Sequence, residues 1–335
     1  MAARAPLLLV LSLALLGLAL VAGVLWGTAE ITWGERLAIL TGAEDAPRGL
    51  SLIVWEWRIP RVIAVALIGA GLSLAGALMQ TALRNPMADP YLMGLSSGAS
   101  AAAVAGIIWL PASLTGAIGI PALAFLGAGA AFTMTLGLSM RRGRPLDPLV
   151  VILAGVAVSL MFQSLTAFLL YLGDPHATRS ALGWLMGTAA GTGWSEIPML
   201  LIGLALVALP ALWRAGDLDA TLLGDERAEA LGVPVDVLRY AIFVGTVVLT
   251  GLAVAVAGIV GFIGLIMPHM ARLLVGARHR VLIPMAMSLG ATVLVAVDLL
   301  CRLLLAPEEL PLGVLLALFA APPFILILRG LRRDG

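Results

Sequence analysis

The stretch from Arg58 to Ser100, RIPRVIAVALIGAGLSLAGALMQTALRNPMADPYLMGLSSGAS, decides how this chain folds. After its first arginines come about 20 apolar and small residues, enough for a helix that spans a bilayer. Pro86 has no backbone donor and disfavours helical geometry at Asn85, so the helix is predicted to end there. A second apolar run begins at Tyr91. Small residues four positions apart, beginning with Gly69, let helices approach closely in lipid and predict a tightly packed helix pair.

Composition places most of the chain in a membrane. Of its 335 residues, 61% are hydrophobic and 12% are charged, which is about half the charged share of a soluble domain. All 20 residues of the Lys+Arg class are arginine. Because an ordinary phosphate-binding Walker loop uses a lysine, such a loop is excluded and ATP hydrolysis would need a separate subunit. The single cysteine, Cys301, excludes an internal disulfide and is interpreted as a small buried hydrophobe.

Ten membrane-spanning helices are predicted from the apolar runs, so residues 1–335 are expected to form a single all-α membrane domain. The expected ranges are 6–26, 58–82, 92–110, 117–140, 147–172, 195–213, 238–257, 259–276, 281–303 and 312–329. The first run is longer than the core of a signal peptide, and we interpret it as a retained helix.

An even number of helices puts both ends of the chain on the same side of the membrane. Fourteen arginines fall on that side and six on the opposite side. Because cytoplasmic loops carry the excess of basic residues, both termini are predicted to lie in the cytoplasm. The six arginines that oppose this tendency are Arg36, Arg48, Arg58, Arg61, Arg179 and Arg302.

The two halves of the chain, residues 1–172 and 195–330, are predicted to be repeats of five helices each. An ungapped shift of 182 residues lays Gly69 on Gly251 and Pro86 on Pro268. Five helices per half would place the two copies in opposite orientation, the inverted-repeat design of many transporters.

A long polar loop, residues 214–237, follows the predicted helix at 195–213 and contains LLGDERAEALGVP at 222–234. Gly224 separates a short apolar turn from a short helix that begins with acidic residues and stops at Gly232. Ala228 and Leu231 are expected to share one face of that helix. From the residues alone, a surface helix lying on the membrane is the favoured interpretation.

A second motif, GFIGLIMPHMARLLVGARHR, occupies residues 261–280. His269 has no second histidine, cysteine or carboxylate at metal-ligand spacing, so it is interpreted as a packing residue rather than a metal ligand. The arginines at 272, 278 and 280 are expected to anchor the cytoplasmic end of the helix.

Three arginines lie at the predicted outer ends of helices. Arg58 and Arg61 begin one helix, and Arg302 ends another, four residues after Asp298. The four-residue spacing allows Arg302 and Asp298 to pair along the helix. As interfacial anchors, these arginines would need no partner.

The motifs and their order resemble the FecCD/BtuC-type permease family of ABC importers for iron–siderophores, haem and cobalamin. The resemblance covers roughly residues 50–330 and rests on Gln80, Asn85, Pro86, Pro90, Gly94, Gly98, Gly264, Pro268, His269 and Arg272. It implies a type II importer permease that works as a homodimer between two ATPase subunits and a periplasmic or lipid-anchored binding protein. ATP and Mg would be held by the ATPase, and this chain is expected to bind no metal or cofactor and to catalyse no reaction.

The resemblance also implies roles for particular residues. Coupling to the ATPase would fall on the loop at 214–237, through Leu223, Gly224, Asp225, Glu226, Ala228, Leu231 and Gly232. Docking of the binding protein would fall on Arg58, Arg61 and Arg302. An iron(III)–siderophore is the expected cargo, with haem and cobalamin as alternatives.

Two other classes of membrane protein remain as rival interpretations. A secondary transporter is disfavoured because the predicted helices contain few polar side chains, and proton- or ion-coupled carriers keep charged groups at mid-membrane depth. An intramembrane enzyme is disfavoured because the chain lacks an H-E-x-x-H motif and its three histidines are scattered.

Overall fold

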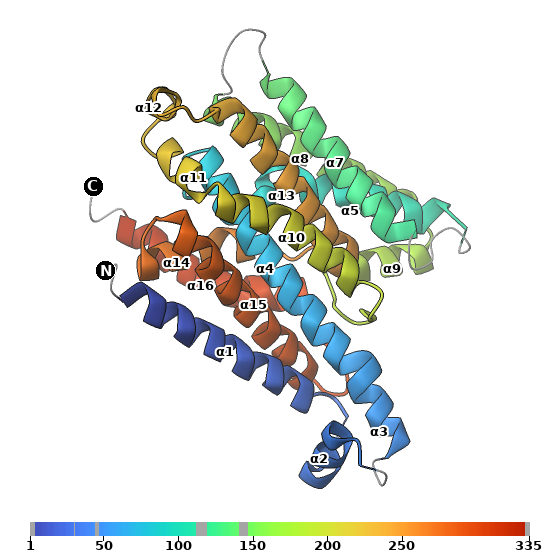
Figure 1. Ribbon diagram of the computed structural model, residues 1–335. Helices are drawn as coiled ribbons and strands as arrows, with labels where there is room; N and C mark the ends of the chain where they lie inside the picture. Colours follow the sequence, from blue (N-terminus) through green and yellow to red (C-terminus); the bar gives the residue numbers. More distant parts are fainter. Residues whose placement is uncertain (1–3, 30, 44–46, 112–118, 141–146, 332–335) are drawn as a thin grey trace.

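The computed structural model describes residues 4–29, 31–43, 47–111, 119–140 and 147–331, and within these ranges every regular element is helical (Figure 1). In chain order the elements are α1 (Ala5–Leu25), α2 (Trp33–Thr41), α3 (Arg48–Leu52), the π-helical stretch η2 (Ile53–Arg58), α4 (Ile59–Ala82), the 3-10 helix η3 (Pro90–Met93), α5 (Leu95–Trp109), α7 (Gly119–Ser139), α8 (Pro148–Leu172), α9 (Pro175–Leu185), α10 (Ile197–Trp213), α11 (Ala215–Thr221), α12 (Asp225–Ala230), α13 (Val235–Ala257), α14 (Ile263–Val275), α15 (His279–Leu303) and α16 (Leu312–Leu331). Five of the fourteen arginines predicted on the cytoplasmic side, at positions 141, 142, 144, 332 and 333, lie outside the described residues.

Ten apolar segments among the described residues correspond one to one to the ten predicted ranges. Six helices are long and apolar enough to cross a membrane, and one further pair, α10 and α11, is bent by 69° at its junction. Three shorter apolar helices, α5, α14 and the first part of α16, complete the set. The all-α membrane architecture predicted from composition is therefore confirmed.

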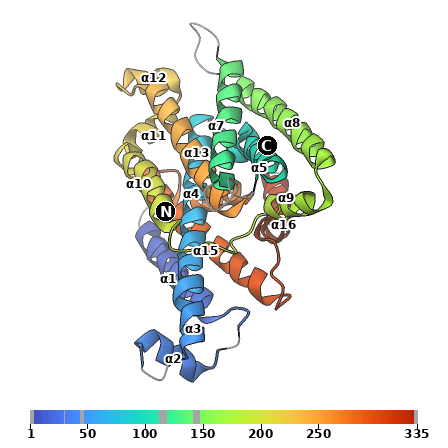
Figure 2. The same ribbon diagram turned by 90° about the vertical axis from the view of Figure 1, so that its right-hand side faces the viewer.

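Helix α4 lies at the centre of the bundle and runs through it in both views (Figures 1 and 2). It packs against α15, α13, α14 and α10, and both large hydrophobic clusters include its residues. At Gly76 a methyl group would overlap the carbonyl of Gly264 on α14, and at Gly69 it would overlap the carbonyl of Gly290 on α15. The small residues predicted to allow close approach thus bring backbone against backbone.

The start of α1 and the end of α16 lie at the end of the bundle that carries α11 and α12, whereas α2 lies at the opposite end (Figure 1). Ala5 at the start of α1 packs in one hydrophobic cluster with Val275 and Leu282. Leu282 lies near the start of α15, and α15 contacts α11. We call the α11–α12 end the inner end and the α2 end the outer end.

The 182-residue shift is wrong as a structural register. Pro86 lies in a turn after α4, whereas Pro268 lies inside α14. The assignment of residues 1–172 and 195–330 as inverted halves does not depend on that register and stays a prediction.

Two helical segments were not predicted as such. Residues 48–57, which precede the second predicted membrane helix, are helical from Arg48 and continue into α4 as one helix of 35 residues. The segment at 173–193, between the predicted helices at 147–172 and 195–213, contains α9, whose start is capped by the Asp174 side chain through the N–H groups of His176 and Ala177. Its alternation of polar and small residues hid the helix, because the helix is half-exposed rather than buried in the bundle.

Candidate functional site

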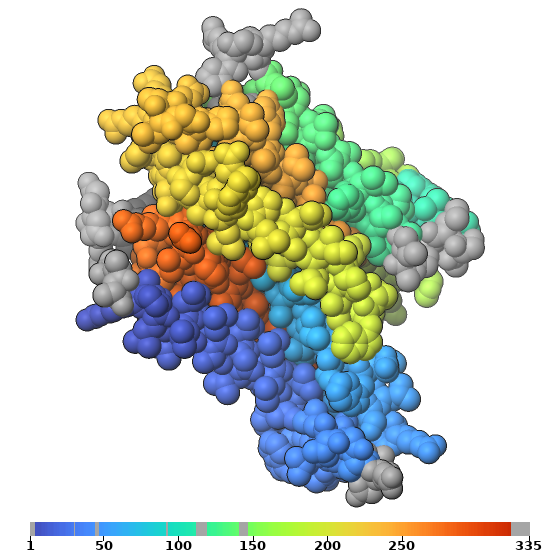
Figure 3. All heavy atoms as spheres, in the orientation of Figure 1, coloured from blue at the N-terminus to red at the C-terminus, as the bar shows by residue number. Residues whose placement is uncertain are grey.

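The inner end of the bundle carries two short helices, α11 and α12, joined at Gly224. Gly224 has φ +106°, a backbone conformation that glycine adopts without strain. The chain after α12 turns at Gly232, with φ +83°. The structure thus has the predicted break between the two short helices at Gly224 and the predicted end of the second helix at Gly232. In the space-filling view this segment forms a rounded projection at the upper left of the molecule (Figure 3).

The apolar side chains of this segment are divided between its two sides. Leu222, Leu223 and Leu231 are exposed, Leu231 to 67%. Ala228 is fully buried and packs with Val233 and Val235. The expectation that Ala228 and Leu231 share one face is therefore wrong. Leu231 follows the last residue of a helix of only six residues, so its direction is set by the turn rather than by helical periodicity.

The two acidic residues at the start of α12 also point to different sides. Glu226 is exposed, whereas both oxygens of Asp225 accept from the Arg239 guanidinium at 3.1 Å. Asp225 therefore faces the bundle. The exposed part of the predicted coupling set comprises Leu223, Glu226, Leu231 and Gly232.

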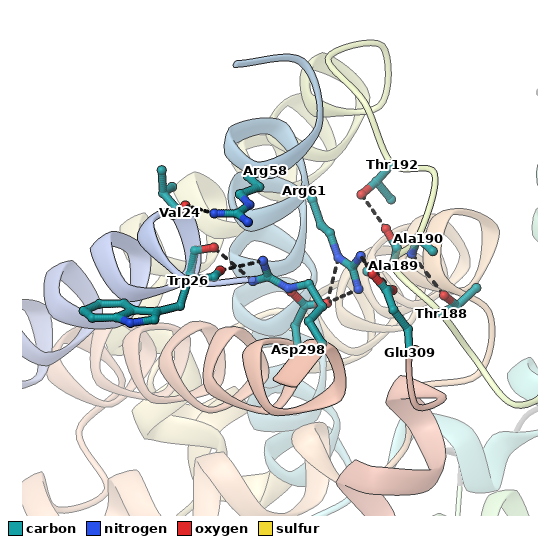
Figure 4. Close-up of polar contacts among 12 residues, drawn as sticks. Val24, Trp26, Arg58, Arg61, Thr188, Ala189, Ala190, Thr192, Asp298 and Glu309 are labelled. Carbon is teal, nitrogen blue, oxygen red and sulfur yellow. Dashed lines mark hydrogen bonds and ion pairs between the residues drawn. The ribbon is translucent and has the colours of Figure 1, made fainter. Parts of the chain in front are cut away.

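At the outer end, Arg58 points back to the end of α1 (Figure 4). Its guanidinium donates to the carbonyls of Val24 and Leu25 at 3.3 Å and of Ala29 at 2.8 Å. Only 5% of the residue is exposed. Carbonyls at a helix C-terminus lack intrahelical donors, so Arg58 supplies the missing donors for α1.

Arg61 and Arg302 share the carboxylate of Asp298, and Figure 4 shows Arg61 pointing toward Asp298 and Glu309. Arg61 lies 2.8 Å from Asp298 and 2.8 Å from Glu309, while Arg302 lies 3.1 Å from the other Asp298 oxygen. Arg302 also donates to the carbonyls of Trp26 and Gly23. The predicted pairing of Arg302 with Asp298 is found. All three arginines meet at one end, and each is bound inside the fold.

The first family motif lies where α4 turns into α5. The side chain of Asn85 accepts from the N–H of Met87 and closes this turn. Pro90 begins η3, and Gly94 ends it with φ +89°. Gly98 on α5 lies against the carbonyl of Gly127 on α7. These residues shape the backbone rather than form a binding pocket.

The second family motif packs on the first through α14. The Gln80 side chain donates to the carbonyls of Gly264 and Leu265 and accepts from Arg272. Arg272, expected to be a cytoplasmic anchor, therefore binds the centre of the bundle.

The remaining two residues of this motif also lie on α14. Pro268 is buried within the helix, and His269 is half-buried. Within the described part of the chain, no three His, Cys, Asp or Glu residues are grouped so that they could hold a metal ion.

Five residues that the sequence did not single out connect α4 to the α11–α12 segment: Thr81, Arg84, Asp219, Arg239 and His279. The charges of Arg84 and Arg239 were visible in the sequence, but nothing in their spacing indicated a partner.

Comparison of the sequence with known proteins assigns the chain to a family. Residues 14–330 match the sequence profile of the FecCD transport family. The chain belongs to the FecCD transport family. Among FecCD-related proteins, the vitamin B12 import system permease BtuC of Vibrio cholerae is 38% identical over 276 residues, covering 82% of each chain. The iron(III) dicitrate permease FecD of Escherichia coli K12 is 37% identical over 330 residues, covering 98% of this chain and all of FecD.

The FecCD fold is also found in a solved structure described as a metal-chelate type ABC transporter in an inward-facing conformation. That chain has a TM-score of 0.83 and 28% sequence identity, with 97% of this chain and 99% of the other covered. The protein is thus a permease subunit of an ABC importer of the FecCD/BtuC type, and the resemblance drawn from its motifs is confirmed.

Proposed function

We propose that this permease imports an iron(III)–siderophore chelate across a bacterial inner membrane, driven by ATP hydrolysis in partner subunits. Two copies would enclose the path, with two ATPase subunits at the inner end and a periplasmic or lipid-anchored binding protein at the outer end. Both termini would then lie in the cytoplasm. The excess of arginine at the inner end supports this orientation.

The observation that carries the proposal is the exposed apolar surface of the α11–α12 segment. Leu222, Leu223 and Leu231 are exposed in the turns that follow α11 and α12, two helices of seven and six residues. Polar links attach the same segment to the bundle. A partner that covers these leucines would remove apolar area from water. A cytoplasmic ATPase on this surface would be the motor that a chain without lysine cannot contain.

Docking of the binding protein is proposed for the outer end, where Arg58, Arg61 and Arg302 meet. Arg61 and Glu309 form the most accessible pair, with side chains 12% and 30% exposed. Charge-assisted contacts at such a site would orient the partner and make docking sensitive to salt. Arg58 and Arg302 would act by holding the shape of that surface.

The test of the coupling surface uses the assembled importer. We expect Leu231→Glu and Gly224→Glu to abolish ATP-driven uptake while the permease still copurifies as a folded dimer. Glu229→Gln, on the exposed side of α12, is the control and is expected to behave as wild type. Normal uptake by Leu231→Glu in an intact complex would overturn the assignment. ATP-independent accumulation of cargo by the purified permease alone would favour a secondary transporter instead.

Vitamin B12 is the second candidate cargo, because the BtuC proteins of Vibrio cholerae and Halobacterium salinarum are named for it and are both 38% identical to this chain. Uptake in a deletion strain should be measured with radiolabelled iron(III)–siderophore, iron(III) dicitrate, haem and cobalamin in parallel. Uptake of an iron chelate alone would support the proposal. Uptake of cobalamin alone would replace it with the second candidate.

A further inference from the structure

A chain of polar contacts joins α11 to the last turn of α4. The Asp219 carboxylate accepts from the backbone N–H of His279 at 2.9 Å and lies 2.6 Å from its Nδ1. Because a carboxylate only accepts, Nδ1 carries a proton. On the other side of the ring, Nε2 lies 2.7 Å from the Thr81 hydroxyl. Thr81 and His279 are buried, so the contact lies inside the bundle.

A second chain joins α12 to the same turn of α4. Asp225 accepts from Arg239 through both oxygens at 3.1 Å, and Arg239 Nε donates to the carbonyl of Ala82 at 3.4 Å. Arg239 is only 5% exposed, and a buried guanidinium requires partners of this kind. Arg84 completes the group, with its Nη2 3.3 Å from Asp225.

Arg84 occupies a position that normally belongs to glycine. The N–H of Arg84 donates to the carbonyl of Thr81, and the N–H of Asn85 to that of Gln80, the Schellman pattern that ends a helix. This pattern puts Arg84 in the left-handed region, with φ +46°. A side chain there is strained, and such strain persists where the surroundings demand that residue. The surroundings here are Asp225 and Gly224, both on the α11–α12 segment.

We infer that the end of α4 and the turn that follows it, residues 81–84, is the point at which movement of the α11–α12 segment enters the membrane bundle. Arg84, Arg239 and His279 are positioning residues for that step. The inference rests on the proposed function, since it assigns the receiving end of the ATP-driven movement. It adds residues outside the predicted coupling set of 223–232.

Helix α4 can transmit such a movement along its length because its close packing prevents the helix from deforming locally. Its contacts at Gly69 and Gly76 bring backbone against backbone, and tightly packed elements shift as units rather than deform. The 24 residues of α4 span about 36 Å at 1.5 Å per residue. Its far end carries Arg61, which binds Asp298 and Glu309 at the outer end.

The first experiment separates coupling from stability with two substitutions of Arg84. Arg84→Gly removes both the side chain and the strain, whereas Arg84→Ala removes the side chain and keeps the strain. We expect Arg84→Gly to unfold at a higher temperature than Arg84→Ala. Both variants should raise the ATP hydrolysed per cargo molecule by the same factor, at least about twofold.

The measurements use the complete importer in liposomes, with radiolabelled iron(III) dicitrate and cobalamin as the cargo probes. If Arg84→Gly keeps the wild-type ratio of ATP to cargo, the inference is overturned while the proposed function stands. If the wild-type complex imports neither probe nor any other chelate with ATP, the proposed function fails and the inference fails with it.

The second experiment addresses the contact through His279. Thr81→Val removes the hydroxyl and keeps the volume, and Thr81→Ser restores the hydroxyl. Asp219→Asn is matched by Asp217→Asn on the same helix, because Asp217 is half-exposed and pairs only with Arg214 among the described residues. We expect Thr81→Val and Asp219→Asn to raise the ATP-to-cargo ratio at least about twofold, and both controls to leave it unchanged.

A double variant shows whether the residues act as one path. If Thr81 and Asp219 act through His279, the double variant should lose no more coupling than the more affected single variant. Multiplication of the two single effects would mean that the residues act separately, and it would overturn the connection through His279. Equal ratios for Asp219→Asn and Asp217→Asn would also overturn it.

Discussion

The two ends of α4 differ in what their charged residues hold. At the outer end, the Arg58 contacts among the described residues are to main-chain carbonyls of the α1 end and of the chain that follows it, and Arg302 combines two such carbonyls with the Asp298 carboxylate. At the inner end, the main contacts join side chains, as between Asp219 and His279 or Asp225 and Arg239. The helices held there have seven and six residues, whereas α1 has 21 residues and packs against α15.

This difference indicates different mechanical roles. Contacts to main-chain carbonyls break only when the helix that offers them unwinds. Contacts between side chains can be exchanged by changes of rotamer while both helices stay intact, which suits an element that moves in each cycle. The attachment of α1 at the outer end therefore resembles a fixed support, and the attachment of α11 and α12 at the inner end resembles a movable joint. Arg61, Asp298 and Glu309 add side-chain contacts at the outer end.

The largest expected effect lies between the two ends, at Gly76. Replacing it with leucine would drive a side chain into the Gly264 carbonyl and separate α4 from α14. The expected loss of unfolding free energy exceeds about 4 kcal/mol. Gly129→Leu on α7 is the matched control, because no atom lies within 4 Å of its added Cβ. Size-exclusion chromatography and thermal unfolding in detergent should distinguish them, and a monodisperse Gly76→Leu protein would contradict the rigid contact.

A fixed outer end predicts a large cost for Arg302→Ala. The substitution leaves the carbonyls of Gly23 and Trp26 without this donor and removes one partner of buried Asp298. Breaking a buried pair in this way is expected to cost about 3 kcal/mol. Thermal unfolding and proteolysis after α1 would measure it, with exposed Arg179→Ala as control. Unchanged stability would show that the outer end is not a support.

A smaller effect is expected on α2, which lies beyond that support. The Thr32 hydroxyl and N–H both donate to the Glu35 carboxylate and hold its pKa below the ordinary value of 4.5. Because the folded pKa is lowered, this contribution is present above pH 4.5 and is lost as the pH falls through the folded pKa. The protection factor for hydrogen exchange at the α2 N-terminus, which is the intrinsic rate at each pH divided by the observed rate, should fall on acidification in wild type. In Glu35→Gln the protection factor should be low at both pH values, and any other pattern would contradict the cap.

The smallest effect on stability is expected for Leu231→Glu at the movable inner end. Leu231 is 67% exposed, so its replacement should change the unfolding free energy by no more than about 0.5 kcal/mol. Transport should nevertheless be lost, for the reason given above. A variant that is both unstable and inactive would place Leu231 in the fold and not on a partner surface. Thermal unfolding beside uptake separates the two outcomes.

The sequence was sufficient to predict the ten apolar membrane segments and the two short helices of the inner loop. Apolar runs fixed the ten helices, because a bilayer demands a nearly constant length of apolar chain. Gly224 and Gly232 marked the ends of the short helices, because each adopts a backbone conformation that other residues resist. In the same loop, periodicity misplaced Leu231, since α12 ends before a full second turn.

What the sequence could not provide is the partner of each charge. Arg58 and Arg302 were predicted at the correct end. The carbonyls that accept from them belong to the end of α1 and the residues after it, and one of them, that of Trp26, is 276 positions from Arg302 in the chain. His269 attracted attention as the motif histidine, whereas His279 makes the buried contact with Asp219, 60 residues away. Pairings at such distances leave no trace in local spacing.

The attachment of α1 has a consequence for how the protein is made. Among the described helices, α1 precedes all the others in the chain, yet its last carbonyls are bound by Arg58 on the second long helix and by Arg302 on α15. During synthesis α1 therefore stays only partly secured in the lipid until α15 is inserted. A helix made before the other described helices is thus among the last of them to reach its final place.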